Sequence, residues 1–222
     1  MKYLVTLLLI CNFGQLFSQK KQCFCEKDTL MNDATIDCAT TILGNKSKLY
    51  WQFNCTRIWL TLENVNGRKV VLDEVPVEYY GYTYRLGFHL VKEFEKSILF
   101  RSGCPANGPC TYLLIDKSSG KQIAEFGQLI CIDTDLRDSK KYQFDFVVYF
   151  SEDYGKMEIY YVNSKKRLII PFDTERNNFT SIIPEYQFDR MDLNGDMLTL
   201  DYTTDEQEKM QLKLNLTERK SN

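Results

Sequence analysis

The fold class is decided by one stretch, SILFRSGCPANGPCTYLLIDKSSGKQIAEFGQLI, which spans residues 97–130. It reads as a strand, a cysteine-flanked loop, a second strand, a tight turn and a third strand. Residues 98–100 are apolar, residues 111–115 are rich in β-branched and aromatic types, and residues 121–126 resume an extended pattern. Residues 118–120, Ser-Ser-Gly, are types that tight turns prefer. The stretch therefore predicts an antiparallel hairpin unit.

Weaker copies of this unit precede and follow it. The turns of their last hairpins fall near Gly67, Gly120, Lys165 and Glu206, so successive turns are 53, 45 and 41 residues apart. A β-propeller blade of four strands has a period of about 40 to 50 residues. No segment shows a sustained apolar period of a helix. We therefore expect an all-β fold of antiparallel meanders in about four hairpin repeats, propeller-like, with a β-sandwich or barrel as the alternative.

The remaining strands are expected on both sides of the central stretch. A turn at Asn66-Gly67 is favoured because both residue types accept a positive φ. Before the central stretch, strands are expected over residues 49–54, 57–62 and 68–72, followed by a long aromatic strand or strand pair over residues 78–90. After it, strands are expected over residues 142–150, 156–162, 167–172, 185–191, 197–202 and 209–216. In the last of these, leucines alternate cleanly with polar residues, which indicates that one face is buried.

The N-terminus has the layout of a secretory signal peptide, residues 1–18. Lys2 supplies the positive start, residues 3–17 are mostly apolar, and the small Ser18 precedes a cleavage point at Gln19. The apolar stretch is shorter than the about 20 residues of a membrane span, and no later segment is apolar enough to cross a bilayer. We therefore expect a secreted or periplasmic protein with no transmembrane segment after signal cleavage.

The rest of the chain divides into two parts, an N-terminal arm tethered by disulfides, residues 19–48, and a single all-β domain, residues 49–222. Lys2 is the only charged residue in the signal peptide, so the 28 basic residues become 27 against 30 acidic ones. A protein that binds nucleic acid through a basic face needs an excess of positive charge. The charge balance therefore argues against nucleic acid as a partner.

Eight cysteines suit an oxidising compartment. Cys11 leaves with the signal peptide. Cys104 and Cys110 flank a loop rich in turn residues that can bring its ends together, so we expect a local bridge between them. Two more bridges would pin the arm to the strand around Cys55, and the candidates are Cys23, Cys25, Cys38 and Cys55. Cys131 is then the odd thiol, and the sequence leaves the connectivity open.

Neither a metal nor a cofactor is expected. Cys23-x-Cys25 is too tight for a structural zinc site, and His89 is the only histidine. The segment DLNGD, from Asp192 to Asp196, has oxygen ligands at the alternating spacing that calcium prefers. An Asn-Gly hairpin turn explains the same letters. The sequence leaves calcium binding at this segment open.

The pattern predicts no catalytic residue. His89 is the one side chain whose ordinary pKa suits proton transfer near neutral pH. Its apolar neighbours Phe88 and Leu90 favour a structural strand residue instead, and no serine lies in a G-x-S-x-G nucleophile elbow. We therefore expect a non-enzymatic protein. The alternative is a secreted carboxylate-dependent hydrolase of the glycoside type.

An aromatic run is the best candidate for a binding surface. Tyr80, Tyr82 and Tyr84 would share one face of a strand, and together with Tyr79 and His89 they are the candidate binding residues. Alternate tyrosines on an exposed face would form a ledge for a sugar or a partner protein. The alternative is that they lie in the core or cover a sheet edge. We expect a secreted or periplasmic binding or envelope-associated protein whose partner is a glycan or an envelope protein.

The ending Leu16-Phe17-Ser18-Gln19-Lys20 resembles the signal peptides of secreted proteins from Bacteroidota. The mature chain also resembles small, uncharacterised, cysteine-containing secreted proteins of that group, which have no assigned activity. The resemblance covers the signal ending and a loose pattern of aromatics and hairpins. It implies export and carries no functional residue with it.

Overall fold

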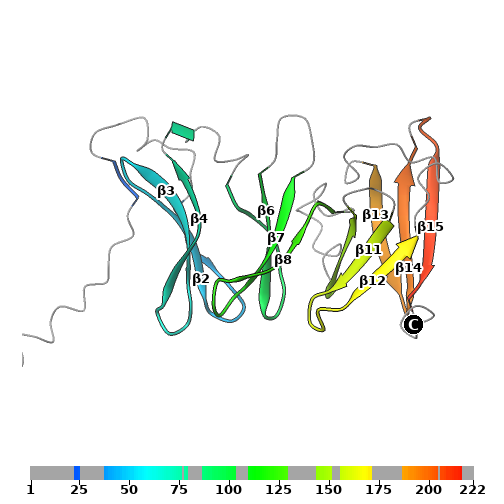
Figure 1. Ribbon diagram of the computed structural model, residues 1–222, viewed down its shortest axis with the longest axis horizontal. Coiled ribbons are helices and arrows are strands. Elements are labelled where there is room, and N and C mark those ends of the chain that lie inside the picture. The colour runs from blue at the N-terminus through cyan, green and yellow to red at the C-terminus, as the bar shows by residue number, and fades with distance from the viewer. Residues whose placement is uncertain are drawn as a thin grey trace, which may run out of the picture.

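The computed structural model describes residues 23–25, 38–76, 78–79, 87–103, 110–129, 144–151, 156–171, 187–204 and 206–216. The strands in this part of the chain form four antiparallel sheets, which we name A to D in chain order (Figure 1). Within each sheet, strands that follow one another in sequence are also neighbours in space. The described fold is therefore a series of meanders, and the predicted all-β class is confirmed.

The first two sheets contain four strands each. Sheet A consists of β1 (Thr41–Ile42), β2 (Lys48–Phe53), β3 (Arg57–Glu63) and β4 (Lys69–Pro76). Sheet B consists of β5 (His89–Glu93), β6 (Ser97–Ser102), β7 (Thr111–Asp116) and β8 (Gln122–Phe126). The last three strands of sheet B are the three strands that the central stretch predicts.

Sheet C consists of β9 (Gln128–Leu129), β10 (Phe146–Phe150), β11 (Lys156–Tyr161) and β12 (Arg167–Pro171). Sheet D has three described strands, β13 (Phe188–Asn194), β14 (Met197–Thr203) and β15 (Lys209–Asn215). Only Gly127 separates β8 from β9, so a single bend carries the chain from sheet B to sheet C.

The four sheets share one local feature, a residue with a left-handed backbone in the hairpin before the last described strand. These residues are Gly67, Gly120, Lys165 and Gln207, with φ of 77°, 72°, 57° and 65°. A left-handed residue is the usual way to close a hairpin loop that begins with a type I turn. Their positions coincide with the predicted turns to within one residue, which confirms the hairpin repeat.

The sheets pack face to face. Because alternate residues of a strand point to opposite faces, one strand can contact the sheets on both sides of it. In sheet B, Ile98 and Phe100 pack against sheet A, whereas the intervening Leu99 packs against sheet C. In sheet C, Val147 packs toward sheet B, and Val148 packs toward sheet D. The two inner sheets are thus buried on both faces, as blades are in a propeller.

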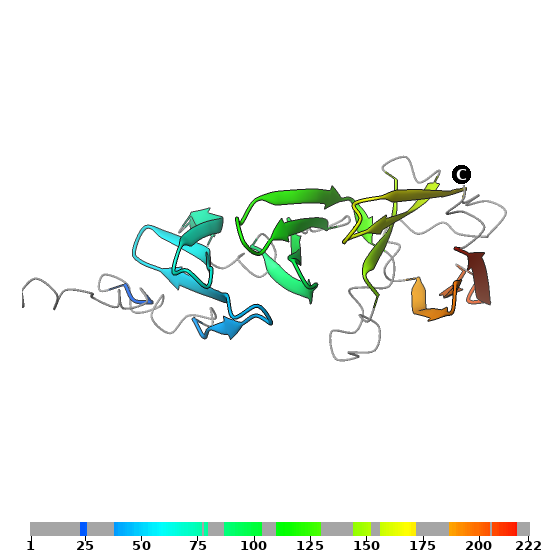
Figure 2. The same ribbon diagram turned by 90° about the horizontal axis from the view of Figure 1, so that it is seen from below.

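The stack forms an open row. Figures 1 and 2 place sheet A at one end of the molecule and sheet D at the other, with B and C between them. Within the described residues, one core joins A to B, a second joins B to C, and a third joins C to D, whereas none joins D to A. The sheets are therefore propeller-like in their packing, and the described part does not close into a ring.

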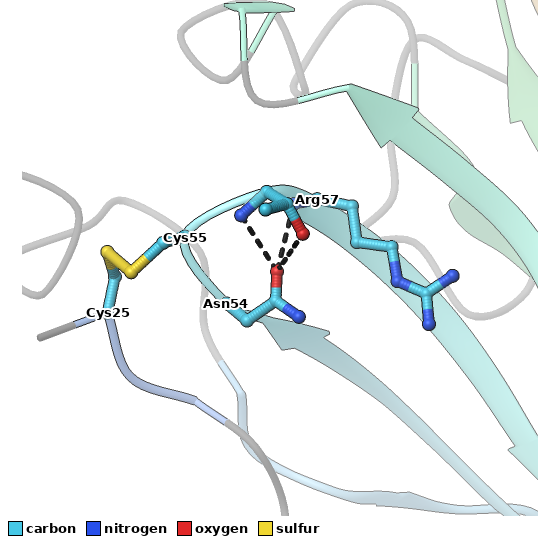
Figure 3. The surroundings of a disulfide bond; sticks show 5 residues. Cys25, Asn54, Cys55 and Arg57 are labelled. Atoms are coloured by element: carbon cyan, nitrogen blue, oxygen red, sulfur yellow. Dashed lines mark hydrogen bonds between the residues drawn. A yellow bond between two sulfur atoms is a disulfide. The ribbon is translucent and has the colours of Figure 1, made fainter. Parts of the chain in front are cut away.

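One disulfide tethers the N-terminal arm to the turn beside Cys55, as predicted, whereas the second closes a loop within the arm. Cys23 bonds to Cys38, and Cys25 bonds to Cys55 with 4.8 Å between the Cα atoms. Figure 3 shows that the bridge between Cys25 and Cys55 reaches the turn between β2 and β3. In this turn the side chain of Asn54 accepts hydrogen bonds from the backbone N–H groups of residues 56 and 57 at 2.8 and 3.0 Å. The bridge is thus anchored on an ordered turn.

Cys110 also forms a disulfide. Its predicted partner, Cys104, lies outside the described residues, as does Cys131, so the local bridge and the odd thiol stay predictions. No helix in the described residues has the length and apolarity needed to cross a membrane.

The expected aromatic strand over residues 78–90 is wrong at its start, its last two residues lie in a strand, and residues 80–86 lie outside the described residues. Strand β4 continues through Pro76, and Glu78 and Tyr79 then form a short helical turn. Strand β5 begins only at His89. Proline cannot donate to a sheet ladder and is confined to edge positions such as the end of β4 at Pro76.

Candidate functional site

The predicted tyrosine ledge falls mostly outside the described residues. Tyr80, Tyr82 and Tyr84 lie in the part of the chain that is not described. Tyr79 is described, and its side chain is 52% exposed, but it lies in the helical turn after β4 rather than in a strand. The ledge as a binding surface therefore stays a prediction, with one of its residues shown to be accessible.

His89 is the first residue of β5 and is half-buried. Its partner across the sheet is Arg101 of β6. The structure thus places His89 in a strand of sheet B and Tyr79 in the helical turn after β4. Its proposed role in binding stays a prediction.

The calcium candidate forms the hairpin between β13 and β14. Gly195 has a φ of 59°, and the backbone N–H of Leu216 donates a hydrogen bond to the carbonyl of Asp196 at 2.8 Å. Arg190 forms an ion pair with Asp192. Among the described residues, no three histidine, cysteine or acidic side chains are close enough to hold a metal ion. The geometry of this segment is that of a hairpin.

Sheet C carries a charged and aromatic cluster that the sequence analysis did not identify. It consists of Tyr149 on β10, Glu158 and Tyr160 on β11, and Arg167 on β12. The strand register places Tyr149 opposite Glu158 and Tyr160 opposite Arg167. Residues directly opposite each other in an antiparallel pair share a face. We call these four residues the cation–tyrosine cluster.

Arg167 holds the centre of the cluster. Its guanidinium carbon lies 6.0 Å from the ring centre of Tyr149 and 5.8 Å from that of Tyr160, within the range of a cation–π contact. Its Nη1 lies 3.5 Å from Oε2 of Glu158, and the hydroxyl of Tyr149 donates a hydrogen bond to the same carboxylate oxygen. The guanidinium is therefore oriented by one carboxylate and backed by two rings.

The cluster is built at the seam between sheets B and C. Phe126, at the end of β8, packs its ring 4.9 Å from that of Tyr149 and 5.2 Å from that of Tyr160, measured between ring centres. Both tyrosines are buried, whereas the side chain of Arg167 is 53% exposed. The cluster therefore presents a cation to solvent on a rigid aromatic base.

The electrostatics of the cluster suit binding rather than proton transfer. Burial raises the pKa of Tyr149 above its ordinary value, and the hydrogen bond and charge of Glu158 raise it further, against the opposing effect of Arg167. Burial also raises the pKa of Tyr160, again against Arg167. Since both hydroxyls stay protonated near neutral pH, Tyr149 acts as a hydrogen-bond donor and not as a base.

An exposed apolar side chain and two further cations adjoin the cluster. Ile169 of β12 lies opposite Glu158 and is 54% exposed. Lys165 and Lys166, in the turn that leads into β12, are also exposed and make three consecutive cations with Arg167. This end of sheet C can therefore bind a negatively charged group beside an apolar one.

The cluster escaped sequence analysis because its members are far apart in sequence. The strands expected over residues 142–150, 156–162 and 167–172 contain all four side chains, and the turn at residues 163–166 joins the last two. Folding these strands as a meander around that turn would have placed Val162 opposite Arg167, whereas the structure pairs Arg167 with Tyr160. The missing information was the register, which the positive φ of Lys165 helps to fix.

No family model matches the sequence, and no curated protein matches it. Among solved structures, the chain is similar to one reported under "Structural and Mechanistic Analysis of Two Prolyl Endopeptidases", with a TM-score of 0.42 and 12% identity, over 80% of this chain and 25% of that chain. It is also similar to an uncharacterized protein from Listeria monocytogenes EGD-e, with a TM-score of 0.33 and 12% identity, over 82% of this chain and 67% of that chain.

A third similar structure is TolB from Acinetobacter baumannii, with a TM-score of 0.27 and 14% identity, over 78% of this chain and 39% of that chain. The chain thus spans a quarter of the length of the prolyl endopeptidase chain and less than half of TolB. These scores are low, and the fold and the cluster described above rest on the chain's own strands and contacts.

Proposed function

We propose that this chain is an exported, non-enzymatic binding protein whose partner is an acidic envelope protein held at the cation–tyrosine cluster. The observation that carries the proposal is the state of Arg167, which is half exposed yet fixed by Glu158 and by two rings. A side chain that is already oriented loses less entropy on binding than a free one. Such a residue is prepared to receive a second carboxylate.

Charge supports an acidic partner. Lys165, Lys166 and Arg167 form a local excess of positive charge on a chain whose formal net charge is −2. A basic patch of this kind steers an acidic surface toward it and fixes the register of the encounter. Arginine can also bind a carboxylate through two parallel hydrogen bonds, which adds geometric specificity.

Export is supported by the cysteines and the N-terminus. The bridges Cys23–Cys38 and Cys25–Cys55 are the kind of crosslink that persists in an oxidising compartment. The signal-like residues 1–18 would take the chain there. N-terminal sequencing of protein recovered from the periplasm or medium should give Gln19 as the first residue, and an N-terminus at Met1 would contradict export.

The binding proposal is tested by titration calorimetry with two capped peptides, hexaglutamate and the uncharged hexaglutamine. We expect heat of binding from hexaglutamate only, weakened about tenfold in the variant Arg167→Gln, which corresponds to about 1.4 kcal/mol. The matched control is Arg190→Gln, which removes an exposed arginine from sheet D. Equal binding of both peptides, or an equal loss in the two variants, would contradict the proposal.

One further outcome would replace the acidic protein by a glycan as the proposed partner. If hexaglutamate gives no heat and uncharged oligosaccharides on a glycan array bind instead, the acidic-protein partner is wrong. The carboxylate-dependent hydrolase stays a prediction that a hydrolysis assay on polysaccharides would check.

A further inference from the structure

The last strands of the four sheets protect their edges differently. An unpaired strand edge invites pairing with another chain, and proteins block it with bulges, with proline or with charged side chains, lysine above all. Strand β4 has a register shift against β3, and β8 has one against β7. Strand β15 has an even register but carries Lys209 and Lys213. Each of these three edges therefore has at least one protective feature.

Strand β12 has protective residues only at its two ends, Arg167 and Pro171. Its five residues, RLIIP, pair with β11 without a register shift, and its only charged residue is Arg167 at the very start. In the described part of the chain, no strand pairs with its other edge. Ile169, at the centre of the strand, is 54% exposed. This edge is even, apolar and accessible.

The hydrogen-bond pattern shows which backbone groups face that edge. The N–H of Tyr161 donates to the carbonyl of Lys166 at 2.9 Å, so this pair points inward, toward β11. Because inward and outward groups alternate along an antiparallel strand, the backbone groups of Arg167, Ile169 and Pro171 point outward. Proline has no N–H and is tolerated at such an outward position. The free edge therefore offers the N–H groups of Arg167 and Ile169.

The same two residues define what an added strand would meet. Arg167 and Ile169 lie on one face of sheet C, two residues apart. A strand that pairs antiparallel with β12 would place one residue opposite Ile169 and the residue two positions later opposite Arg167. An added strand that complements these two residues therefore has an apolar side chain and, two positions later, an acidic one.

We propose that β12 accepts an extended segment of the partner as a fifth strand of sheet C, with an apolar-x-acidic pattern facing Ile169 and Arg167. This inference rests on the proposed function, because it specifies how the acidic partner is held. Main-chain hydrogen bonds supply affinity in this mode of recognition, and the alternate side chains supply specificity.

The pattern is tested with two capped peptides of equal composition. One has a central Val-Thr-Glu within a run of alternating threonine and serine, and the other has Val-Glu-Thr at the same place. In the second peptide the glutamate would point to the opposite face of the sheet. We expect the first peptide to bind about threefold more tightly, the size of one favourable cross-strand charged pair. Equal affinities would overturn the proposed register.

Strand pairing is tested separately with Ile169→Pro, which removes an outward N–H and leaves the ladder to β11 intact. The control is Ile169→Val, which keeps the N–H. We expect the proline variant to lose binding of the Val-Thr-Glu peptide and the valine variant to keep it, with equal circular dichroism spectra. Should the proline variant unfold, a peptide N-methylated at the valine blocks the same pairing with the wild-type protein, and it should not bind.

The outcomes separate the two proposals. Loss of binding in Arg167→Gln with full binding in Ile169→Pro would overturn strand addition and leave the cluster as a simple charge site. Loss in neither variant would overturn both. Sedimentation velocity without peptide gives a third outcome, since a dimer abolished by Ile169→Pro would make a second copy of the chain, and not a partner peptide, the occupant of this edge.

Discussion

The outward faces of the two end sheets differ in what they bury. On sheet A, the outward side chains of Tyr50, Trp59 and Thr61 are all buried. On sheet D, no outward side chain of β14 is buried, and the alternate residues that face inward, such as Leu198 and Leu200, are fully buried. Sheet A thus buries side chains on both faces, and sheet D on one only.

The buried face of sheet A is held by side-chain hydrogen bonds. Gln52 accepts from the indole N–H of Trp59 at 3.1 Å and from the hydroxyl of Thr61 at 2.8 Å. The hydroxyl of Tyr50 donates to Glu63 at 2.9 Å. The outward face of sheet D carries surface contacts instead, such as the hydrogen bond from Gln211 to Asp201. A polar outer face of this kind is what terminates a stacked repeat.

The largest loss of stability should come from removing the central aromatic side chain of sheet A. Trp59→Ala should lower the free energy of unfolding by about 3 to 5 kcal/mol, because it leaves a cavity and removes one of the two hydrogen bonds that Gln52 accepts. The matched change on sheet D, Thr199→Ala, should stay within about 0.5 kcal/mol. Urea unfolding followed by fluorescence checks both, and similar losses in the two variants would break the comparison.

The second-largest loss of stability should come from removing a disulfide. Replacing Cys25 and Cys55 by serine should cost about 2 to 4 kcal/mol. The bridge between Cys23 and Cys38 closes a loop half as long, with a separation of 15 instead of 30 residues. Its removal should cost about 0.6 kcal/mol less. Thermal unfolding of the two double variants gives the order, and a reversed order would show that the bridges act through something other than loop length.

Tyr50 should make sheet A sensitive to high pH. Burial, together with the hydrogen bond and charge of Glu63, raises the pKa of Tyr50 well above its ordinary value. A raised pKa gives stability that is complete below the unfolded value of about 10 and is lost as the pH rises above it. Tyr50→Phe should cost about 1 kcal/mol at neutral pH and should show a shallower alkaline loss of stability. An identical pH profile in the variant would contradict this assignment.

The smallest effect should come from the exposed ion pair of sheet D. Arg190 and Asp192 have side chains that are 63% and 51% exposed, so water screens their attraction. Arg190→Ala should change the free energy of unfolding by less than about 0.5 kcal/mol. Chemical denaturation can measure this, and a loss above 1 kcal/mol, roughly the upper limit for exposed pairs, would mean that sheet D is not a simple polar end.

The difference between the end sheets is visible in the sequence. Strand β3 reads IWLTL, a run with apolar or aromatic side chains on both faces, whereas β15 reads MQLKL, in which polar residues alternate. The strict alternation predicts one buried face, and the unbroken run predicts two. The turns at Gly67 and Gly120 were equally legible, because few residues other than glycine tolerate their backbone angles.

Other features depended on contacts between distant segments. Predicting the cation–tyrosine cluster required the pairing register of three strands. The hydrophobic pattern does not determine this register, because a shift by two residues keeps the same side chains on the buried face. The bend at Gly127 was missed because the extended patterns on its two sides are separated by one residue and belong to different sheets. The predicted strand over residues 68–72 ended too early, since β4 continues through the buried Val75 to Pro76.

The open row has a consequence for how the molecule comes apart. When each unit touches only its immediate neighbours, cooperativity is local, and the array behaves as a one-dimensional chain of coupled elements. In the described residues, sheet D packs against one other sheet, whereas sheet B packs against two. Native-state hydrogen exchange should therefore be graded, with amides of β14 opening at a lower free energy than those of β7, so that fraying proceeds inward from the carboxyl end.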